Sequence, residues 1–177
     1  MSRLPTFCSR PGQVRQAASY LEARDSRQDA LAQALSRGHP ATLFLSLNIP
    51  GPEKTLPGAE ALFFWMLDQL PAHFPNPAIE CETSDLLGPY VILGIEADPI
   101  AVKEACIQLE AEHPSSRLID LDVYAIDGTQ IDRGCLGHES RTCLVCDQRA
   151  VDCIRAKRHS FEETICKVHE LLAPFRT

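Results

Sequence analysis

Residues 90–126 decide the fold of this chain, and they read YVILGIEADPIAVKEACIQLEAEHPSSRLIDLDVYAI. The apolar run 90–96 predicts a β-strand. Asp98 followed by Pro99 is the pattern of an N-cap carboxylate with proline in the first turn, so a helix begins there, and Pro114 ends it. Residues 118–126 alternate between apolar and polar side chains over most of their length, which predicts a second strand.

The segments before residue 90 complete a recurring order. Residues 42–49 predict a strand, residues 58–70 a helix stopped by Pro71, and residues 78–83 a weaker strand. From residue 42 to 126 the order is β-α-β-β-α-β. We therefore expect an α+β fold with a ferredoxin-like core, in which an antiparallel sheet carries two helices on one face.

The flanking segments differ from this core. Helical spacing before residue 40 predicts two helices with a break at Asp25-Ser26. Ser160 and Glu163 fit a capping box that opens a last helix. We expect an N-terminal helical segment over 1–40, a catalytic core over 41–133, and a Cys-rich, helical C-terminal extension over 134–177 that packs on the core.

Composition excludes several classes of protein. The 177 residues include 17 Lys and Arg against 24 Asp and Glu, a net charge of −7, and 45% are hydrophobic, as in globular proteins. The acidity argues against a nucleic-acid partner. No run approaches the roughly 18 apolar residues of a membrane span, so no membrane partner is expected. The N-terminus carries no apolar leader, which favours a cytoplasmic location where the eight cysteines stay reduced.

An Asp-x-Asp pair lies on the predicted strand 118–126. Alternation places Ile119 and Leu121 on the core face and puts Asp120 and Asp122 on the other, with Cα atoms about 6.5–7 Å apart. Two carboxylates at this separation suit Mg²⁺ bound together with substrate phosphates. The alternative is a solvated face on which the two aspartates pair with Arg or Lys.

Basic and polar residues near this pair are candidate phosphate ligands. Arg117 precedes the strand and fits either a partner for the aspartates or a phosphate ligand. Asn48 and Lys54 flank the turn after the first predicted strand, and Arg27 lies near the predicted helix break. For each of these three residues taken alone, the pattern favours a solvated surface group over a phosphate ligand.

Cysteines cluster after residue 134. Cys143, Cys146, Cys153 and His159 form the pattern C-x2-C-x6-C-x5-H. Four N and S ligands suit a closed tetrahedral Zn²⁺ site. The alternatives are ordinary buried thiols, a redox C-x-x-C pair, and phosphate binding by His159 with the basic residues at 155–158. The spacing leaves these open.

These motifs together resemble a known family. The stretches EHPSSRLIDLDV at 112–123, RTCLVC at 141–146 and CIRAKRH at 153–159 resemble the apo-citrate lyase phosphoribosyl-dephospho-CoA transferases. Shorter stretches upstream are similar too: SRQ at 26–28, HP at 39–40 and PGPEK at 50–54. The resemblance runs from about residue 24 to residue 172.

The resemblance implies an activity. Members of the family, also called citrate lyase holo-acyl-carrier-protein synthases, transfer a prosthetic group from 2′-(5″-triphosphoribosyl)-3′-dephospho-CoA to a serine of the citrate lyase acyl carrier protein, and pyrophosphate leaves. This is a nucleotidyl transfer. The chemistry then suggests that Asp120 and Asp122 hold Mg²⁺ and act with Arg117 in catalysis. The general base stays open between Asp122 and a metal-bound hydroxide.

The chemistry of this transfer also suggests which side chains bind the substrate and the carrier. We assign Lys54, Arg27, Asn48, Arg141 and Arg155 to substrate binding. The basic run 155–159, RAKRH, is a candidate docking patch for an acidic carrier protein, or else solvated charge at a helix end.

Two other functions are consistent with the same residues. The strand RLIDLDV at 117–123 is similar to the metal-binding strand of hydroxymethyl-dihydropterin pyrophosphokinase, which favours an Mg²⁺-dependent pyrophosphokinase or another nucleotide transferase. A zinc-stabilised module that binds citrate lyase without catalysis is the third reading.

Overall fold

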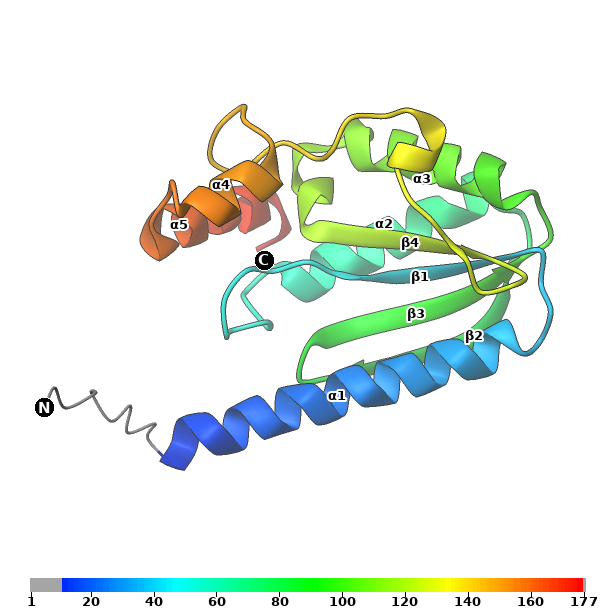
Figure 1. Cartoon of the computed structure of the whole chain (residues 1–177), viewed down its shortest axis with the longest axis horizontal. Coiled ribbons are helices and arrows are strands. Elements are labelled where there is room, and N and C mark those ends of the chain that lie inside the picture. The colour runs from blue at the N-terminus through cyan, green and yellow to red at the C-terminus, as the bar shows by residue number, and fades with distance from the viewer. Residues whose placement is uncertain (1–10, 177) are drawn as a thin grey trace, which may run out of the picture.

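The computed structural model describes residues 11–176, and side chains from residue 19 onward. Five α-helices and a five-stranded antiparallel sheet occur in this range (Figure 1). The helices are α1 (Pro11–Leu35), α2 (Ala59–His73), α3 (Pro99–Glu112), α4 (Ala150–Ala156) and α5 (Phe161–Leu172). The strands are β1 (Ala41–Leu47), β2 (Ala78–Asp85), β3 (Gly88–Ile95), β4 (Ile119–Ala125) and β5 (Gln130–Ile131). None of the described helices is long and apolar enough to cross a membrane.

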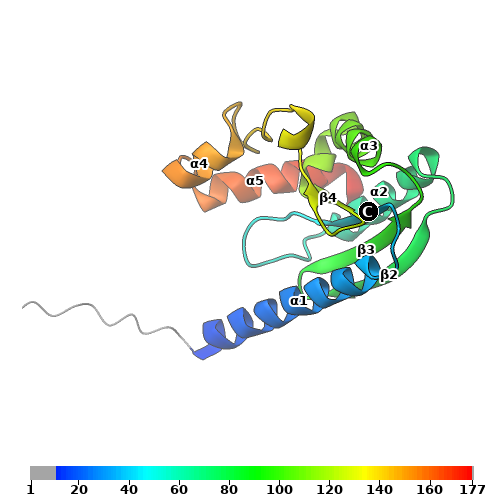
Figure 2. The same cartoon turned by 45° about the vertical axis from the view of Figure 1, so that its right-hand side comes forward.

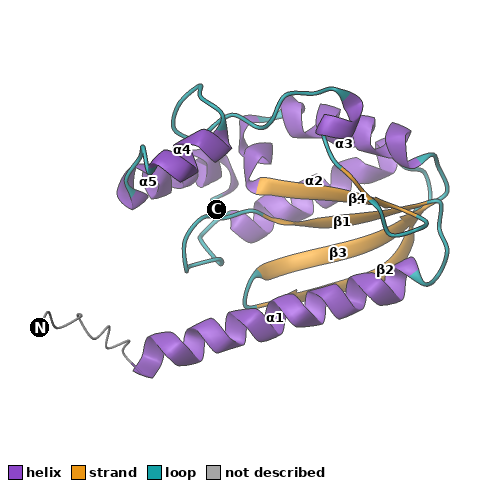
Figure 3. Ribbon diagram, viewed as in Figure 1, coloured by secondary structure: helices purple, strands orange, loops and turns teal. Residues whose placement is uncertain are grey.

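The strand order across the sheet is β2-β3-β1-β4-β5, and every pairing is antiparallel. β1 lies between β3 and β4, and its register sets Ser46 opposite Asp120 and Phe44 opposite Asp122. Figure 3 shows the strands as one continuous layer between helices. The Asp-x-Asp strand therefore has a central strand on one side, and on the other only the two residues of β5.

The two faces of the sheet carry different helices. The main core lies between the sheet, α2, α3 and α5, and it buries Leu43, Phe63 and Val123. A smaller cluster on the opposite face packs α1 against Phe44 and Tyr90. Figures 1 and 2 show α1 beside β2 and β3, and α1 also contacts β1. Because helices cover both faces of β3, every residue of this strand is buried.

Several predicted boundaries hold closely. Asp98 caps α3 through a hydrogen bond from the Ala101 amide to its Oδ2 atom, with proline in the first turn. Ser160 and Glu163 form the expected capping box of α5. The expected strands over 42–49, 78–83, 90–96 and 118–126 correspond to β1–β4, with ends displaced by at most two residues.

Two helix predictions were wrong. Asp25-Ser26 does not break a helix, because α1 is continuous through it. Ser and Asp cost only a fraction of a kcal/mol within a helix, whereas Leu31 and Ala34 pack on the sheet further along the same helix. Val14 and Ala18, two of the apolar residues at helical spacing before residue 40, lie outside the described side chains. Pro71 also does not stop α2, which ends at His73. Proline removes one amide donor from the helix, but Leu70 and Phe74 on either side of it are buried in the main core.

His39 connects the α1–β1 loop to the edge of the sheet. Its Nε2 atom lies 2.8 Å from Glu80 Oε1, and its Nδ1 atom lies 2.8 Å from Glu96 Oε1. The imidazole packs directly over Gly94, so closely that a Cβ atom there would lie 2.2 Å from the ring. Gly94 therefore serves the fold through the close approach of this ring.

We expect Gly94→Ala to destabilise the protein by about 1–3 kcal/mol, because the new methyl group displaces a ring that two carboxylates hold in place. In a His39→Ala background the same change should cost much less. Urea unfolding of the four proteins of this double-mutant cycle measures the difference. Equal costs of Gly94→Ala in the two backgrounds would rule out this packing.

His39 also predicts a pH dependence of stability. Hydrogen bonds to Glu96 and Glu80 raise the pKa of His39 above its usual 6.5. The charged ring therefore adds stability below pH 6.5, and this contribution disappears as the pH rises through the raised pKa. The difference in unfolding free energy between the wild type and His39→Gln should be larger at about pH 6 than at about pH 9. A difference independent of pH would contradict this.

Candidate functional site

Strand β4 places the two aspartates as the alternation predicts. Ile119, Leu121 and Val123 are fully buried in the core, and Asp120 and Asp122 lie half-buried on the opposite face. Helix α1 packs on β1, β2 and β3, and none of its main contacts are with β4. The pair is therefore left open to a cavity of about 390 Å³.

The cavity concentrates charge around the two carboxylates. Burial, followed by the Asp122 carboxylate, raises the pKa of Asp120 to about 6. Burial also raises the pKa of Asp122, against the neighbouring Lys103 charge and a hydrogen bond from Gln130 to Asp122 Oδ1 at 2.9 Å. The two carboxylates thus carry negative charge that the surrounding side chains compensate only in part.

Helix α3 contributes two charged side chains that sequence analysis missed. Lys103 is buried, and its Nζ atom donates to the Leu121 carbonyl of β4 at 2.7 Å. Glu110 is also buried and forms ion pairs with both Arg133 and Arg141. Lys103 and Glu110 are seven residues apart and so share one face of the helix. Two charged residues at this spacing, on the otherwise apolar face of a helix, were the sequence signal that could have predicted these buried charges.

Arg141 joins this cluster to the aspartates. Its Nη2 atom lies 3.2 Å from Asp120 Oδ1 and also pairs with Glu110. Asn48 follows β1 and lines the same cavity. Among the candidates predicted to bind substrate, the structure thus brings Arg141 and Asn48 to the aspartate pair.

Arg117 lies beside a second, larger cavity. It precedes β4 in a short 3-10 helix (Pro114–Leu118), and its Nη2 atom donates to the carbonyls of Thr142 at 2.7 Å and Cys143 at 2.5 Å. The cavity has a volume of about 810 Å³. Asn48, Arg133, Ser140 and Arg141 line both cavities, so the two adjoin each other.

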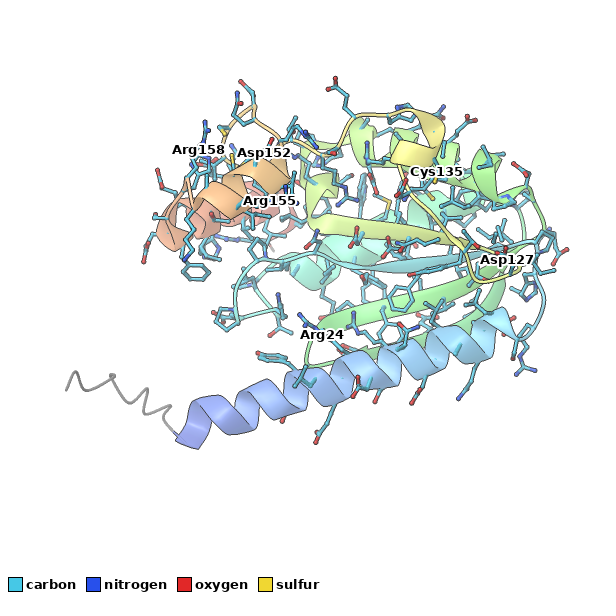
Figure 4. The ribbon with its side chains drawn as sticks, viewed as in Figure 1. Arg24, Asp127, Cys135, Asp152, Arg155 and Arg158 are labelled. Atoms are coloured by element: carbon cyan, nitrogen blue, oxygen red, sulfur yellow. The ribbon has the colours of Figure 1, made fainter. Side chains whose placement is uncertain are left out.

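The other three substrate-binding candidates lie outside both cavities. Arg27 forms a two-pronged ion pair with Asp85 and stacks on Tyr90, so it ties α1 to the β2–β3 hairpin. Lys54 donates to the Ile49 carbonyl, and burial lowers its pKa. Arg155 is exposed on α4, as Figure 4 shows. The structure does not bring these three side chains to the aspartate pair.

The Cys/His pattern converges in space. The ligand atoms of Cys143, Cys146, Cys153 and His159 all lie within 4.8 Å of one another. Cys143 and Cys153 are buried, and Cys146 and His159 are half-buried. This group could hold a metal ion, and it borders the larger cavity through Cys143, Cys153 and His159.

Three known proteins with similar sequences carry the name of one transferase. A protein from Vibrio cholerae O1, named a probable apo-citrate lyase phosphoribosyl-dephospho-CoA transferase, is 40% identical over 85 residues; the match spans 48% of each chain, about half the length of that relative. The transferase of the same name from Citrobacter koseri is 30% identical over 156 residues, which cover 86% of this chain and 85% of the relative. A relative from Streptococcus pyogenes M3 is 32% identical over 93% of this chain and 88% of its own length.

The family model of these proteins matches almost the whole described chain. It extends over residues 16–175 and so includes most of α1, the sheet, both cavities and the Cys/His group. The chain belongs to the apo-citrate lyase phosphoribosyl-dephospho-CoA transferase family.

Proposed function

We propose that this chain transfers the phosphoribosyl-dephospho-CoA group from 2′-(5″-triphosphoribosyl)-3′-dephospho-CoA to a serine of the citrate lyase acyl carrier protein. The serine oxygen forms a bond to the phosphorus next to the ribose. The bond from that phosphorus to the bridging oxygen of the diphosphate breaks, and pyrophosphate leaves with the electron pair of this bond. The serine proton passes to a base. The observation that carries the proposal is the Asp120–Asp122 pair, which opens into a cavity bordered by arginines in a chain of this family.

The aspartate pair fits Mg²⁺ by the chemistry of its donors. Two carboxylates project from one face of a strand, and their pKa values are raised by burial. A divalent cation would offset this charge and is the usual companion of phosphates bound by carboxylates. Bound Mg²⁺ would neutralise charge on the transferring phosphoryl group and on the leaving pyrophosphate.

The chain's own side chains would hold the triphosphate at the junction of the two cavities. Arg133 and Arg141 line both cavities, and their planar donor groups suit phosphate oxygens. Glu110 binds both guanidinium groups and so fixes their position. Lys103 adds a buried positive charge near the aspartates.

The larger cavity suits the rest of the donor. It has a mainly apolar wall that includes Leu144, Val145 and Ile154, with Arg117 and Lys157 among its charged residues. Ser116 also lines it, and its hydroxyl is the buried side-chain polar atom without a partner among the described residues. We place the pantetheine arm, which is a chain of amides and methylenes, in this cavity.

The surface beyond the larger cavity is the proposed docking site for the carrier protein. Arg155 and Arg158 are exposed at the end of α4 (Figure 4), and Lys157 lines the cavity. These charges are local exceptions in an acidic chain. They would orient an acidic carrier with its serine toward the cavity.

We further propose that the core has the ferredoxin-like arrangement. Its support is the order β2-β3-β1-β4 with all neighbours antiparallel, and the packing of α2 and α3 in one core on one face. The division into segments 1–40, 41–133 and 134–177 is part of the same proposal. Residues 1–10 and 177 of these segments lie outside the described residues.

Replacing both site aspartates, Asp120→Asn with Asp122→Asn, should abolish transfer, because the cavity then loses the two carboxylates that we propose to hold Mg²⁺. Intact mass spectrometry of the apo carrier, incubated with donor and Mg²⁺, measures the mass gain. Asp127→Asn is the matched control, because Asp127 lies in the β4–β5 turn (Figure 4), where an amide oxygen can replace the acceptor of the Thr129 amide.

The three possible outcomes separate the readings. A gain with wild type and control but not with the folded double variant supports the proposal. A gain with all three discards the metal site and keeps the transfer. If folded wild type gives no mass gain with a competent carrier, the result favours a pyrophosphokinase or a non-catalytic module.

Glu110→Gln should raise the Michaelis constant for the donor at least as strongly as it lowers kcat, because it loosens both arginines without touching the reacting atoms. We expect a stability loss of about 1–3 kcal/mol, since the replaced group is buried and charged. Initial rates and urea unfolding measure the two effects. Glu112→Gln, exposed and two residues away, is the control. An unchanged Michaelis constant would show that Glu110 does not position the two arginines for binding of the donor.

A further inference from the structure

The segment between the two cavities and α5 has almost no apolar interior of its own. From residue 132 to residue 160, Cys143 and Cys153 are the only buried residues. Two cysteine side chains are too small a core to order a stretch of this length, and small units of this kind are usually ordered by a disulfide or a metal. Contacts of Leu136 and Leu144 with the main core, and the ion pairs of Arg133 and Arg141 with Glu110, hold part of the segment. The turn and the helix that carry the two buried cysteines need a further interaction to fix their conformation.

We propose that Cys143, Cys146, Cys153 and His159 bind one Zn²⁺ ion, which orders this segment as the wall of the larger cavity. Cys146 Sγ lies 3.6 Å from Cys153 Sγ, and His159 Nε2 lies 3.2 Å from Cys146 Sγ. In a tetrahedral site with Zn–S bonds of about 2.3 Å, two sulfurs lie about 3.8 Å apart. The side chains therefore already have nearly the spacing that the ion demands.

The backbone builds this arrangement in two steps. An antiparallel bridge between Thr142 and Arg149, with the Cys143 amide bonded to the Gln148 carbonyl at 2.6 Å, closes a tight turn that carries Cys143 and Cys146. The Val145 amide also points at Cys143 Sγ at 3.5 Å, as amides do toward metal-bound thiolates.

The second half of the site comes from α4 and the turn after it. Cys153 is the one buried residue of this helix. Lys157 ends the helix in a left-handed conformation, with φ at 47°, and the Arg158 amide bonds back to the Cys153 carbonyl at 3.0 Å. This turn reverses the chain and directs His159 back toward Cys146.

The geometry favours a metal over the two alternatives. A redox C-x-x-C pair would join Cys143 and Cys146 in a disulfide, with an S–S distance of about 2.05 Å. Both of these cysteines are free, and Cys146 Sγ lies 3.6 Å from Cys153 Sγ. A disulfide would also use only two of the four groups. Ordinary buried thiols pack against apolar atoms as small hydrophobic groups. Here three sulfurs and one ring nitrogen converge on a common point instead.

The zinc site would also set the position of groups in the transfer site. Arg117 donates to the carbonyls of Thr142 and Cys143, which begin the metal-binding turn. The Arg141 carbonyl accepts from the Ala150 amide at 2.9 Å, and the Arg141 side chain pairs with Asp120. The ion is thus linked through one short segment to both cavities.

The first test is the metal content of the full-length protein purified without added metal, measured by mass spectrometry of the elements. We expect one zinc per chain in the wild type and in Cys135→Ser, and almost none in Cys146→Ser. Cys135 is an exposed cysteine outside the group, near α3 in Figure 4. Zinc that is absent from folded wild type, or that persists in Cys146→Ser, would overturn the proposal.

A gain-of-signal variant keeps the test decisive if Cys146→Ser does not fold. His159→Cys should keep one metal per chain, and after replacement of zinc by Co²⁺ its thiolate-to-metal absorption should increase relative to the wild type. A Co²⁺ protein without the intense bands of tetrahedral thiolate coordination would contradict the site. A disulfide would be assigned instead if two cysteines of the group escape the thiol-blocking reagent and the unlabelled chain is two hydrogens lighter than its fully reduced form.

Removal of zinc by a chelator should make residues 141–158 sensitive to trypsin, because Arg149, Arg155 and Lys157 then lose their fixed backbone. The fragment that carries the sheet should persist, and added zinc should restore resistance. Equal cleavage with and without zinc would show that the ion does not order the wall. These readouts use neither donor nor carrier, so they stand or fall separately from the proposed transfer.

Discussion

The alternation of side chains along β4 is the constraint on which the site depends. Ile119, Leu121 and Val123 are fully buried, and the burial of three such side chains is worth several kcal/mol. A shift of the strand by one residue would expose them and bury both aspartates. The core therefore fixes the direction of the Asp120 and Asp122 carboxylates, even though neither carboxylate contributes to that core.

The outer helix leaves room for this pair. Helix α1 packs across β1, β2 and β3, where Phe44 and Tyr90 supply an apolar surface. Beyond β1 the same face carries the two aspartates, which offer no such surface. Ion pairs replace apolar packing at this edge of the sheet. Glu110 pairs with both Arg133 and Arg141, and Lys103 of α3 donates to the Leu121 carbonyl of β4. One face of the sheet thus has a structural part and a part free for ligands.

Local patterns in the sequence predicted what depends on near neighbours. The faces of β4, the Asp98 cap and the Ser160 capping box follow from side chains within a few residues of one another. The continuity of α1 did not follow, because it rests on contacts with strands far along the chain. The pairs made by Glu110 and the inward Arg27–Asp85 bridge span 23 to 58 residues, and no local spacing encodes such partners.

The segment 132–160 shows how a chain can supply a binding wall without a core. A wall that faces a cavity cannot bury its side chains in the usual way, since one of its sides must remain open to the ligand. The proposed metal coordination would concentrate the ordering energy in four side chains, so that Ile154, and Leu144 beside the main core, can line the cavity. The backbone that carries the proposed zinc ligands also carries Arg141, whose side chain pairs with Asp120. Loss of the ion would therefore disorder the cavity wall and also displace a positive charge from Asp120.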